Sequence, residues 1–417
     1  MLPQSASANI ISTAAWRVLA AIFLVGTINF MDRSLLSIAM PSIRAEFNWS
    51  PTLAGVALSS FLWTYAVGNA VTAPFVDRYG PRRSQALGML FWTVSLVWTA
   101  VTQSFYSLLG SRALLGIAEA PNQAIAIRSI RSFFPEQHTG FACSVGVALV
   151  VRVGPICGFV LGGFLIGEFG WRAAFLMLAA LSLLAIPLWF TMFPKSGSLP
   201  SSVQAKSVGT ATGDVMQFFR YPRFWAVMIG MSANSYIQYL FFSWTPGYLS
   251  TLFKTNIMNI GFMSAAIFGF GVLGNLVSGF GGDVLLRRGY SRLAVRKRII
   301  LLGICLCLPI VIVPQFTSLW GVIFILSLAD FGINVAVPQF WATMSETAPP
   351  HLTASFTGLV NGVANGVGLF APIVTGAIVD ATGSFQLAFL VAGGMLSVIG
   401  VCYGLCLRRI EPLFVRA

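Results

Sequence analysis

Charged side chains are scarce in this sequence. Lys, Arg, Asp and Glu together make up 9% of the 417 residues, whereas 57% are hydrophobic and 13% are aromatic. Because a soluble domain carries about 25% charged residues, this composition excludes an ordinary soluble enzyme or nucleic-acid-binding module and predicts a membrane protein. The net charge of +13 then has to be explained by where the basic residues lie.

Histidine and cysteine are also rare. The chain has two His and six Cys, and the cysteines fall within apolar runs without the paired spacing of zinc ligands. We therefore expect no metal centre and no cofactor. The polar segments between the apolar runs are too short for a catalytic domain, and no nucleophile accompanies a base or a metal set, so the sequence does not predict an enzyme.

Long apolar runs dominate the chain. A helix needs about 20 mostly apolar residues to cross the hydrocarbon core of a bilayer. Twelve such runs are separated by short polar breaks, at residues 16–38, 52–75, 84–104, 106–131, 140–166, 172–193, 223–250, 258–281, 298–317, 319–345, 353–380 and 385–407. The expected fold class is an all-α membrane protein with twelve transmembrane helices in a lipid bilayer.

The basic residues indicate orientation. Most of them, including the run 287–298, fall on the side of these spans that holds both termini. The positive-inside rule places that side in the cytoplasm, so the basic excess predicts topology and no nucleic-acid partner. Residues 1–15 lack the features of a cleaved secretory signal, so the first span is expected to stay in the mature protein.

The two halves of the chain resemble each other. A Ser- and Gly-rich stretch at 195–222 predicts a cytoplasmic linker between a six-helix bundle at 1–194 and a second one at 223–417. The pattern Ala73-x-x-x-Asp77 after the second run is repeated as Gly279-x-x-x-Asp283 after the eighth. Repeats of this size are typical of secondary transporters, whose two bundles rock around a site near the midplane.

The segment from Ala73 to Arg83 resembles the G-x-x-x-D-R-x-G-R-R motif of the major facilitator superfamily, with Ala73 in place of the first Gly. The resemblance covers the whole chain and implies that superfamily's fold. It also implies a gating role, in which the acid lies near the N-terminus of helix eleven and the arginines hold the cytoplasmic side closed. This role falls on Asp77, Arg78, Arg82 and Arg83, with Asp283 as the repeat of Asp77. The alternative is that these charges only set orientation.

Six ionisable residues lie well inside the spans: Asp32, Arg33, Arg112, Glu119, Arg152 and Asp330. At membrane depth each needs a partner, a water-filled cavity or a function. Arg112 and Glu119 share a helix face because they are seven residues apart. If the first and fourth spans are neighbours, they form a cluster with Asp32 and Arg33 in which protonation of an acid releases an arginine for an anion. The alternative is a permanently locked ion-pair network.

Three short elements narrow the family further. The segments 29–33, 112–121 and 63–65 resemble the N-Y-x-D-R, R-x-x-x-G-x-x-E-A-P and W-x-Y elements of the anion:cation symporter branch, which includes bacterial galactonate, glucarate, hexuronate and aromatic-acid transporters, sialin and the vesicular glutamate transporters. The resemblance implies proton coupling by Asp32 and Glu119. It implies substrate or gating contacts by Arg33, Arg112 and Tyr65. Phe30 stands where many members have Tyr, which removes one hydroxyl from the site.

The C-terminal half should supply the rest of the site. By the same resemblance, Tyr239 in the seventh span and Asn361 and Asn365 in the eleventh are candidates to bind substrate oxygens, with helix packing as the alternative. Arg152 and Asp330 match no motif. They are either a specificity arginine and a second protonatable or gating acid, or partners of each other.

These observations predict a proton-coupled symporter that takes up a small organic carboxylate by alternating access. We expect a monomer in the inner (plasma) membrane of a bacterium, with both termini cytoplasmic and protons and the carboxylate as its partners. The alternatives are a proton-antiporting exporter and an organophosphate or anion exchanger of the same fold. The exchanger is less favoured because span 223–250 has no Lys or Arg beyond its cytoplasmic entry.

Overall fold

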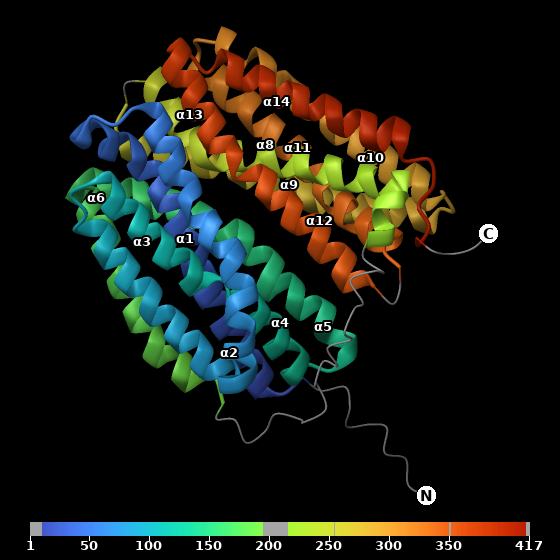
Figure 1. The fold of residues 1–417 in the computed structure, drawn as a ribbon, viewed down its shortest axis with the longest axis horizontal. Coiled ribbons are helices and arrows are strands. Elements are labelled where there is room, and N and C mark those ends of the chain that lie inside the picture. The colour runs from blue at the N-terminus through green and yellow to red at the C-terminus, as the bar shows by residue number, and fades with distance from the viewer. Residues whose placement is uncertain (1–10, 195–215, 254, 350–351, 414–417) are drawn as a thin grey trace, which may run out of the picture. The chain divides into compact units, whose positions relative to one another are not determined.

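The computed structural model of the chain describes residues 11–194, 216–253, 255–349 and 352–413 (Figure 1). These residues form helices joined by short turns, and no strand occurs among them. They cluster into two compact units. The first unit holds the described residues of Met1–Phe47, Ser60–Lys206 and Asn256–Phe262, and the second those of Asn48–Ser59, Ser207–Thr255 and Met263–Ala417.

The first half of the chain contains six α-helices and one π-helical segment among its described residues. They are α1 (Thr13–Phe47), α2 (Pro51–Ala100), α3 (Phe105–Glu119), α4 (Asn122–Phe133), α5 (Glu136–Cys143), the π-helical η1 (Ser144–Leu149) and α6 (Val150–Met192). The start of α2, residues 51–59, belongs to the second unit, and the rest of α2 to the first.

The second half begins with the short 3₁₀ helix η2 (Gln217–Arg220). The further elements are α8 (Pro222–Leu252), α9 (Ile257–Arg287), α10 (Arg292–Cys307), the 3₁₀ segment η3 (Leu308–Gln315), α11 (Leu319–Thr347), α12 (Thr353–Gly368), α13 (Phe370–Thr382), α14 (Gln386–Ile399) and the π-helical η4 (Gly400–Cys406). Of the expected linker, 195–215 lie outside the described residues, and the division at 194 and 223 stays a prediction.

Each of the twelve apolar runs lies mainly on helix. In two places a pair of neighbouring runs lies on one long helix, which is α2 for the first pair and α6 for the second. Each of these helices turns sharply at a glycine with positive φ, Gly80 (φ 76°) in α2 and Gly170 (φ 83°) in α6. Only glycine adopts this backbone conformation readily, so both positions separate one span from the next. The expected single helix at 106–131 is instead divided between α3 and α4, because Pro121 has no N–H to continue the hydrogen-bond ladder.

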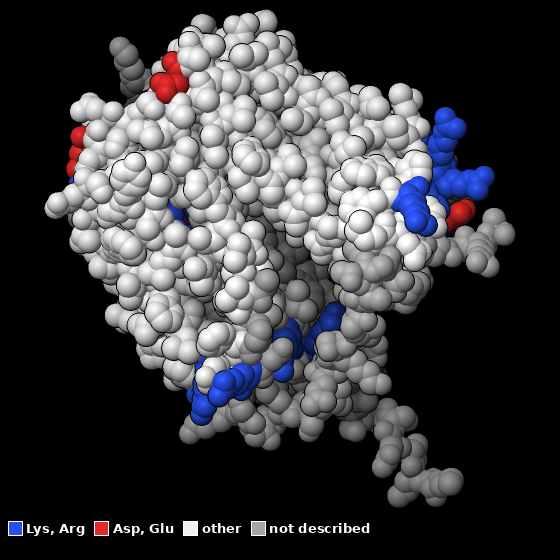
Figure 2. All heavy atoms as spheres, viewed as in Figure 1, with Lys and Arg blue, Asp and Glu red and all other residues white. Residues whose placement is uncertain are grey.

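Seven helical stretches of the described residues are long and apolar enough to cross a membrane. Large apolar side chains also lie exposed on the helices, among them Leu184 (68%) in the first unit and Phe280 (73%) in the second. In Figure 2 most of the visible surface is uncharged, and the Lys and Arg side chains gather in a few clusters. A surface of this kind suits lipid, where exposed apolar side chains carry no penalty.

A stripe of small residues on α6 fixes the position of α1 within the first unit. Gly154, Gly158 and Gly162 recur every fourth residue and face α1. A methyl group added to Gly154 would lie 2.9 Å from the Thr27 carbonyl oxygen, and one added to Gly158 would lie 2.7 Å from the Met31 carbonyl oxygen. Stripes of this type let two membrane helices approach closely. The contact holds the part of α1 that carries Asp32 and Arg33.

We expect Gly158→Ala to destabilise the protein. The added methyl overlaps the Ser34 hydroxyl as well as approaching the Met31 carbonyl, and such overpacking costs about 1–3 kcal/mol. Gly140→Ala in α5 is the matched control, because nothing lies within 4 Å of its added methyl and alanine favours helix by up to about 1 kcal/mol. Thermal unfolding of the purified variants should show a lower midpoint for Gly158→Ala only, and equal midpoints would refute the close contact.

A polar cluster ties the end of α1 to the Gly170 turn of α6. Glu46 accepts hydrogen bonds from Arg172 Nη1 at 2.7 Å and from Trp171 Nε1 at 2.8 Å. The hydrogen bonds from Arg172 and then Trp171 lower the pKa of the Glu46 carboxyl below its ordinary value. The Arg172 guanidinium also stacks on the Trp171 ring, 4.2 Å from its centroid. The C-terminal end of α1 and the Gly170 turn of α6 are therefore joined outside the apolar stretch.

Candidate functional site

The first unit brings the charges of the first and fourth spans together, as the sequence predicts for neighbouring spans. Arg33 of α1 meets Glu119, the last residue of α3. Both Nη2 and Nε of Arg33 donate to Glu119 Oε2, at 3.0 and 3.2 Å. The Glu119 side chain is fully buried, whereas 15% of the Arg33 side chain is exposed. Arg33 is therefore the more accessible member of this pair.

Three aromatic rings surround the Arg33 guanidinium. Its carbon lies 4.4 Å from the Phe61 ring centroid, 4.5 Å from that of Phe30 and 4.9 Å from that of Tyr65. Cation–π contacts of this kind hold a guanidinium in place, with about 0.5–2 kcal/mol for each ring. Phe30 thus contributes one ring face to this contact, and Tyr65, a candidate for substrate or gating contacts, contributes another.

Asp32 lies beside this pair and is almost completely buried, with 1% exposed. Its carboxyl interacts electrostatically with Glu119, Arg112 and Arg33. Neither Asp32 oxygen accepts a hydrogen bond within the part of the chain that the structure describes, and Glu119 Oε1 also lacks one. Two acids therefore lie within hydrogen-bonding reach of each other in the apolar core.

Arg112 is the enclosed arginine of the cluster. It is 1% exposed, its Nη2 donates to Thr99 Oγ1 of α2 at 2.8 Å, and the Phe175 ring of α6 covers it at 5.6 Å. Of the two arginines predicted to touch substrate, Arg33 is the exposed one and Arg112 the enclosed one.

The candidates of the C-terminal half meet within the second unit. The Tyr239 hydroxyl of α8 donates to Asn365 Oδ1 of α12 at 3.1 Å. Asn365 Nδ2 donates to the Asn361 carbonyl oxygen, one turn earlier, at 2.9 Å. The Tyr239 ring packs against Gly368, where a methyl group would collide with it. The Tyr239 hydroxyl, the Asn365 amide and the Asn361 backbone carbonyl therefore form one half-buried polar group.

The gating candidates differ in their surroundings. Arg82 donates to the carbonyl oxygens of Phe190 and Phe193, both at 2.9 Å, and so satisfies the C-terminal end of α6. Arg78 and Arg83 are exposed, as is Asp283 on α9. The side chain of Asp77 lies outside the described residues.

Arg152 and Asp330 belong to different units. Arg152 is half-buried on α6. Asp330 is buried on α11, where the helix backbone at Gly271 approaches its carboxylate so closely that a methyl group would collide. Its backbone oxygen accepts from Asn334 Nδ2 at 2.7 Å.

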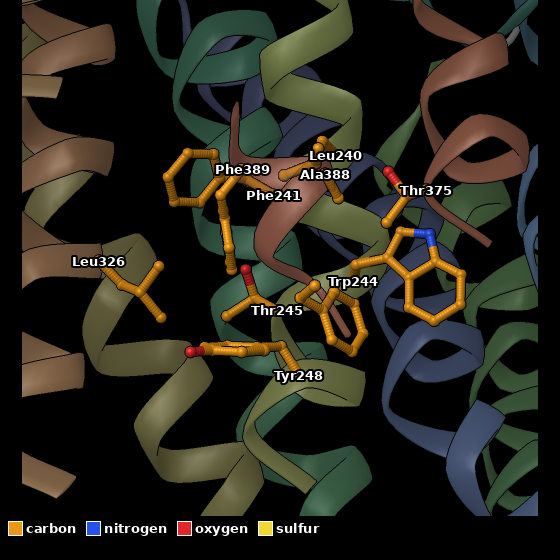
Figure 3. A pocket seen from close by; sticks show the side chains of 10 residues that line it. Leu240, Phe241, Trp244, Thr245, Tyr248, Leu326, Thr375, Ala388 and Phe389 are labelled. Atoms are coloured by element: carbon orange, nitrogen blue, oxygen red, sulfur yellow. The ribbon is translucent and has the colours of Figure 1, made fainter. Parts of the chain in front are cut away.

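Two hollows lie within the units. The one in Figure 3, in the second unit, has ten lining residues, and none of them is charged. A carboxylate would find no cation there. The other, in the first unit, has Phe30 of α1, the amides Asn122 and Gln123 of α4, and Gly146 of η1 among its lining residues. Because Phe30 also contacts Arg33, this hollow adjoins the charged cluster.

Sequence reasoning missed two features of the cluster. Phe61 precedes Tyr65 by one helical turn, so the two rings share a face, but the W-x-Y pattern draws attention to Trp63, which is exposed. Thr99 gives no signal, because a threonine in an apolar run is usually satisfied by its own helix backbone.

The chain is similar to several known proteins. The family model described as "Major Facilitator Superfamily" matches residues 22–371. The chain is 29% identical over 407 residues to a "Probable L-galactonate transporter" of Escherichia coli (strain K12), covering 93% of this chain and 88% of that protein. It is 28% identical to a "Hexuronate transporter" of Bacillus subtilis (strain 168), covering 91% of both.

Solved structures show the same fold. A bacterial homologue of the human lysosomal transporter Spinster, inward-facing and unoccupied, superposes with a TM-score of 0.82 at 17% identity, covering 96% of this chain and 98% of that one. A D-xylose-proton symporter superposes with a TM-score of 0.72 at 14% identity, covering 95% and 98%.

Proposed function

Because the chain belongs to the major facilitator superfamily, and is thus a multi-pass membrane transporter and not an enzyme, we propose that it takes up a small organic carboxylate together with protons by alternating access. The observation that carries this proposal is the contact of Arg33 with Glu119 beside Asp32. Charges at membrane depth are expensive and mark substrate or proton pathways.

Arg33 supplies the anion site. Its guanidinium is held by three rings and one acid, and it is the partly exposed member of the pair. A planar guanidinium binds a carboxylate through two parallel hydrogen bonds. When Glu119 takes up a proton it loses its charge, and Arg33 can bind the carboxylate of the substrate instead.

Asp32 and Glu119 supply the proton site. Two neighbouring buried carboxylates repel each other, and one proton relieves that repulsion. The two acids therefore bind protons as a coupled pair, and the proton is assigned to the pair and not to either residue alone. Binding of the anion then brings the net charge of the cluster closer to zero. This favours the conformational change by which the loaded transporter opens to the other side of the membrane.

We propose sugar acids as the substrate class. The relatives named above are a probable L-galactonate transporter and a hexuronate transporter. Hydroxyl groups of such a substrate need amide and hydroxyl partners. In the first unit Asn122 and Gln123 offer these beside Phe30, and in the second unit Tyr239, Asn361 and Asn365 do so.

The remaining assignments complete the proposal. The exposed arginines Arg78 and Arg83, together with Arg82, Asp77 and Asp283, act in gating. From its enclosed position, Arg112 acts electrostatically on Asp32 and Glu119. Arg152 is a further candidate for substrate specificity, and Asp330 for proton binding or gating. The protein works as a monomer in a bacterial inner membrane with both termini cytoplasmic, and two six-helix halves at 1–194 and 223–417 move about the site.

Thermal unfolding of the purified protein tests the anion assignment. We expect galactonate to raise the unfolding midpoint by about 5 °C at a concentration about 100-fold above its Kd, more strongly at acidic than at alkaline pH. Galactitol, which has the same hydroxyls without the carboxylate, should have little effect. Equal stabilisation by galactitol would contradict the assignment, and other carboxylates in the same screen would rank the substrate class.

A further inference from the structure

Thr99 is a hydrogen-bond partner of Arg112 that the proposed function does not use. Arg112 Nη2 donates to Thr99 Oγ1 at 2.8 Å, and both residues are buried to 1% or less exposure. A permanently charged guanidinium in the apolar core needs strong partners. Its hydrogen bond nevertheless goes to a neutral hydroxyl, although two acids lie within its electrostatic reach.

The Thr99 hydroxyl is fixed by a buried polar network. Its oxygen lies 2.9 Å from the Ser95 carbonyl oxygen and 3.0 Å from Ser111 Oγ. Ser111 Oγ donates to the Leu108 carbonyl oxygen at 2.8 Å, and Ser95 Oγ donates to the Ser111 carbonyl oxygen at 2.6 Å. Because Thr99 has one hydroxyl proton and gives it to this network, its lone pairs remain for Arg112.

One hydrogen-bond donor of Arg112 is unsatisfied. Among the described residues its Nε has no acceptor, and neither oxygen of Asp32 has a donor. The charged groups that act on Asp32 are Glu119 and Arg112 from α3 and Arg33 from its own helix. α4 and α6, which pack along α1, carry the titratable groups Arg128, Arg131, Arg152 and Cys157 within the expected spans 106–131 and 140–166. Arg112 and Asp32 therefore interact electrostatically while each keeps an unsatisfied polar group, and Arg112 is bonded to Thr99.

We propose that Thr99 is a positioning residue, whose hydroxyl holds Arg112 away from Asp32 while the acid pair carries its proton. The inference rests on the proposed function above. When the acids lose the proton, ionised Asp32 competes with Thr99 for the guanidinium. The strength of the Thr99 contact therefore helps to set the pH at which the pair is loaded.

Thr99→Val removes the acceptor at nearly constant volume. Arg112 then turns to Asp32 and stabilises its ionised form, so the pair should bind its proton about tenfold more weakly, which is a shift of about one unit towards lower pH. Thr99→Ser keeps the hydroxyl and should leave the midpoint unchanged. Thr93→Val is the matched control on the same helix, because the Thr93 hydroxyl is bonded to the Met89 carbonyl oxygen of its own helix.

Infrared difference spectroscopy of the full chain in lipid measures this without any substrate. The carbonyl band of protonated carboxylic acids is followed against pH, and its loss in Asp32→Asn assigns it. The expected result is a lower midpoint in Thr99→Val, and in Thr99→Ala as a second variant without the acceptor, with wild-type midpoints in Thr99→Ser and Thr93→Val. An unmoved midpoint in a folded Thr99→Val or Thr99→Ala protein overturns the role of Thr99 alone. If wild type shows no titrating band that depends on Asp32, the proton site of the proposed function fails as well.

Discussion

Asp32→Asn and Glu119→Gln should each abolish accumulation driven by a proton gradient in proteoliposomes. One coupled proton converts one unit of pH difference into about tenfold accumulation. An amide cannot take up the proton, so each variant should fall to a ratio of about one. Both acids are expected to be needed because they lie next to each other in one buried cluster.

Exchange of labelled for unlabelled galactonate separates coupling from general damage. Exchange needs the substrate site and the conformational change but no net proton movement, so at least one of the two variants should retain it. Glu168→Gln is the matched control, because Glu168 is an exposed acid on α6. Accumulation at the wild-type ratio in both Asp32→Asn and Glu119→Gln would refute the proposed coupling site.

Arg33→Gln should weaken galactonate binding by about a hundredfold. The substitution removes the guanidinium that faces the substrate and also leaves Glu119 without its partner in the core, and removal of one member of a buried charge pair costs about 2–5 kcal/mol. Arg33→Lys keeps the charge but not the planar fork, so an intermediate loss is expected. Isothermal titration calorimetry of the purified proteins measures both.

Arg172→Gln is the control for Arg33. Arg172 also forms an ion pair, with Glu46, but its side chain is 41% exposed, and exposed pairs contribute only about 0–1 kcal/mol. Its galactonate affinity should equal that of wild type. A normal affinity in Arg33→Gln would show that the anion binds elsewhere.

The helical fold and the charged cluster could be predicted from the sequence to a large extent. Apolar length alone locates the spans, because a helix is the structure that satisfies its own backbone in lipid. The spacing of Arg112 and Glu119 places them on one face of a helix, and the cost of buried charge requires partners for them. The pairing of Arg33 with Glu119 is one of the few solutions open to such residues.

The parts that could not be predicted depend on contacts between helices. The glycine repeat at Gly154 and Gly158 is visible in the sequence, but the sequence does not say that Thr27 and Met31 are what it packs against. The bond of Arg112 to Thr99 likewise depends on how α2 and α3 are rotated against each other. Nothing in a single sequence fixes such rotations, because an apolar span presents similar side chains on all its faces.

The central claim is that the organic anion and the proton enter together. It is tested most directly by recording the pH outside weakly buffered proteoliposomes when galactonate is added, with no gradient imposed. Symport predicts that the external solution becomes more alkaline as galactonate enters, and that Asp32→Asn gives no such change. Uptake of galactonate without any pH change, or with acidification outside, would contradict the account.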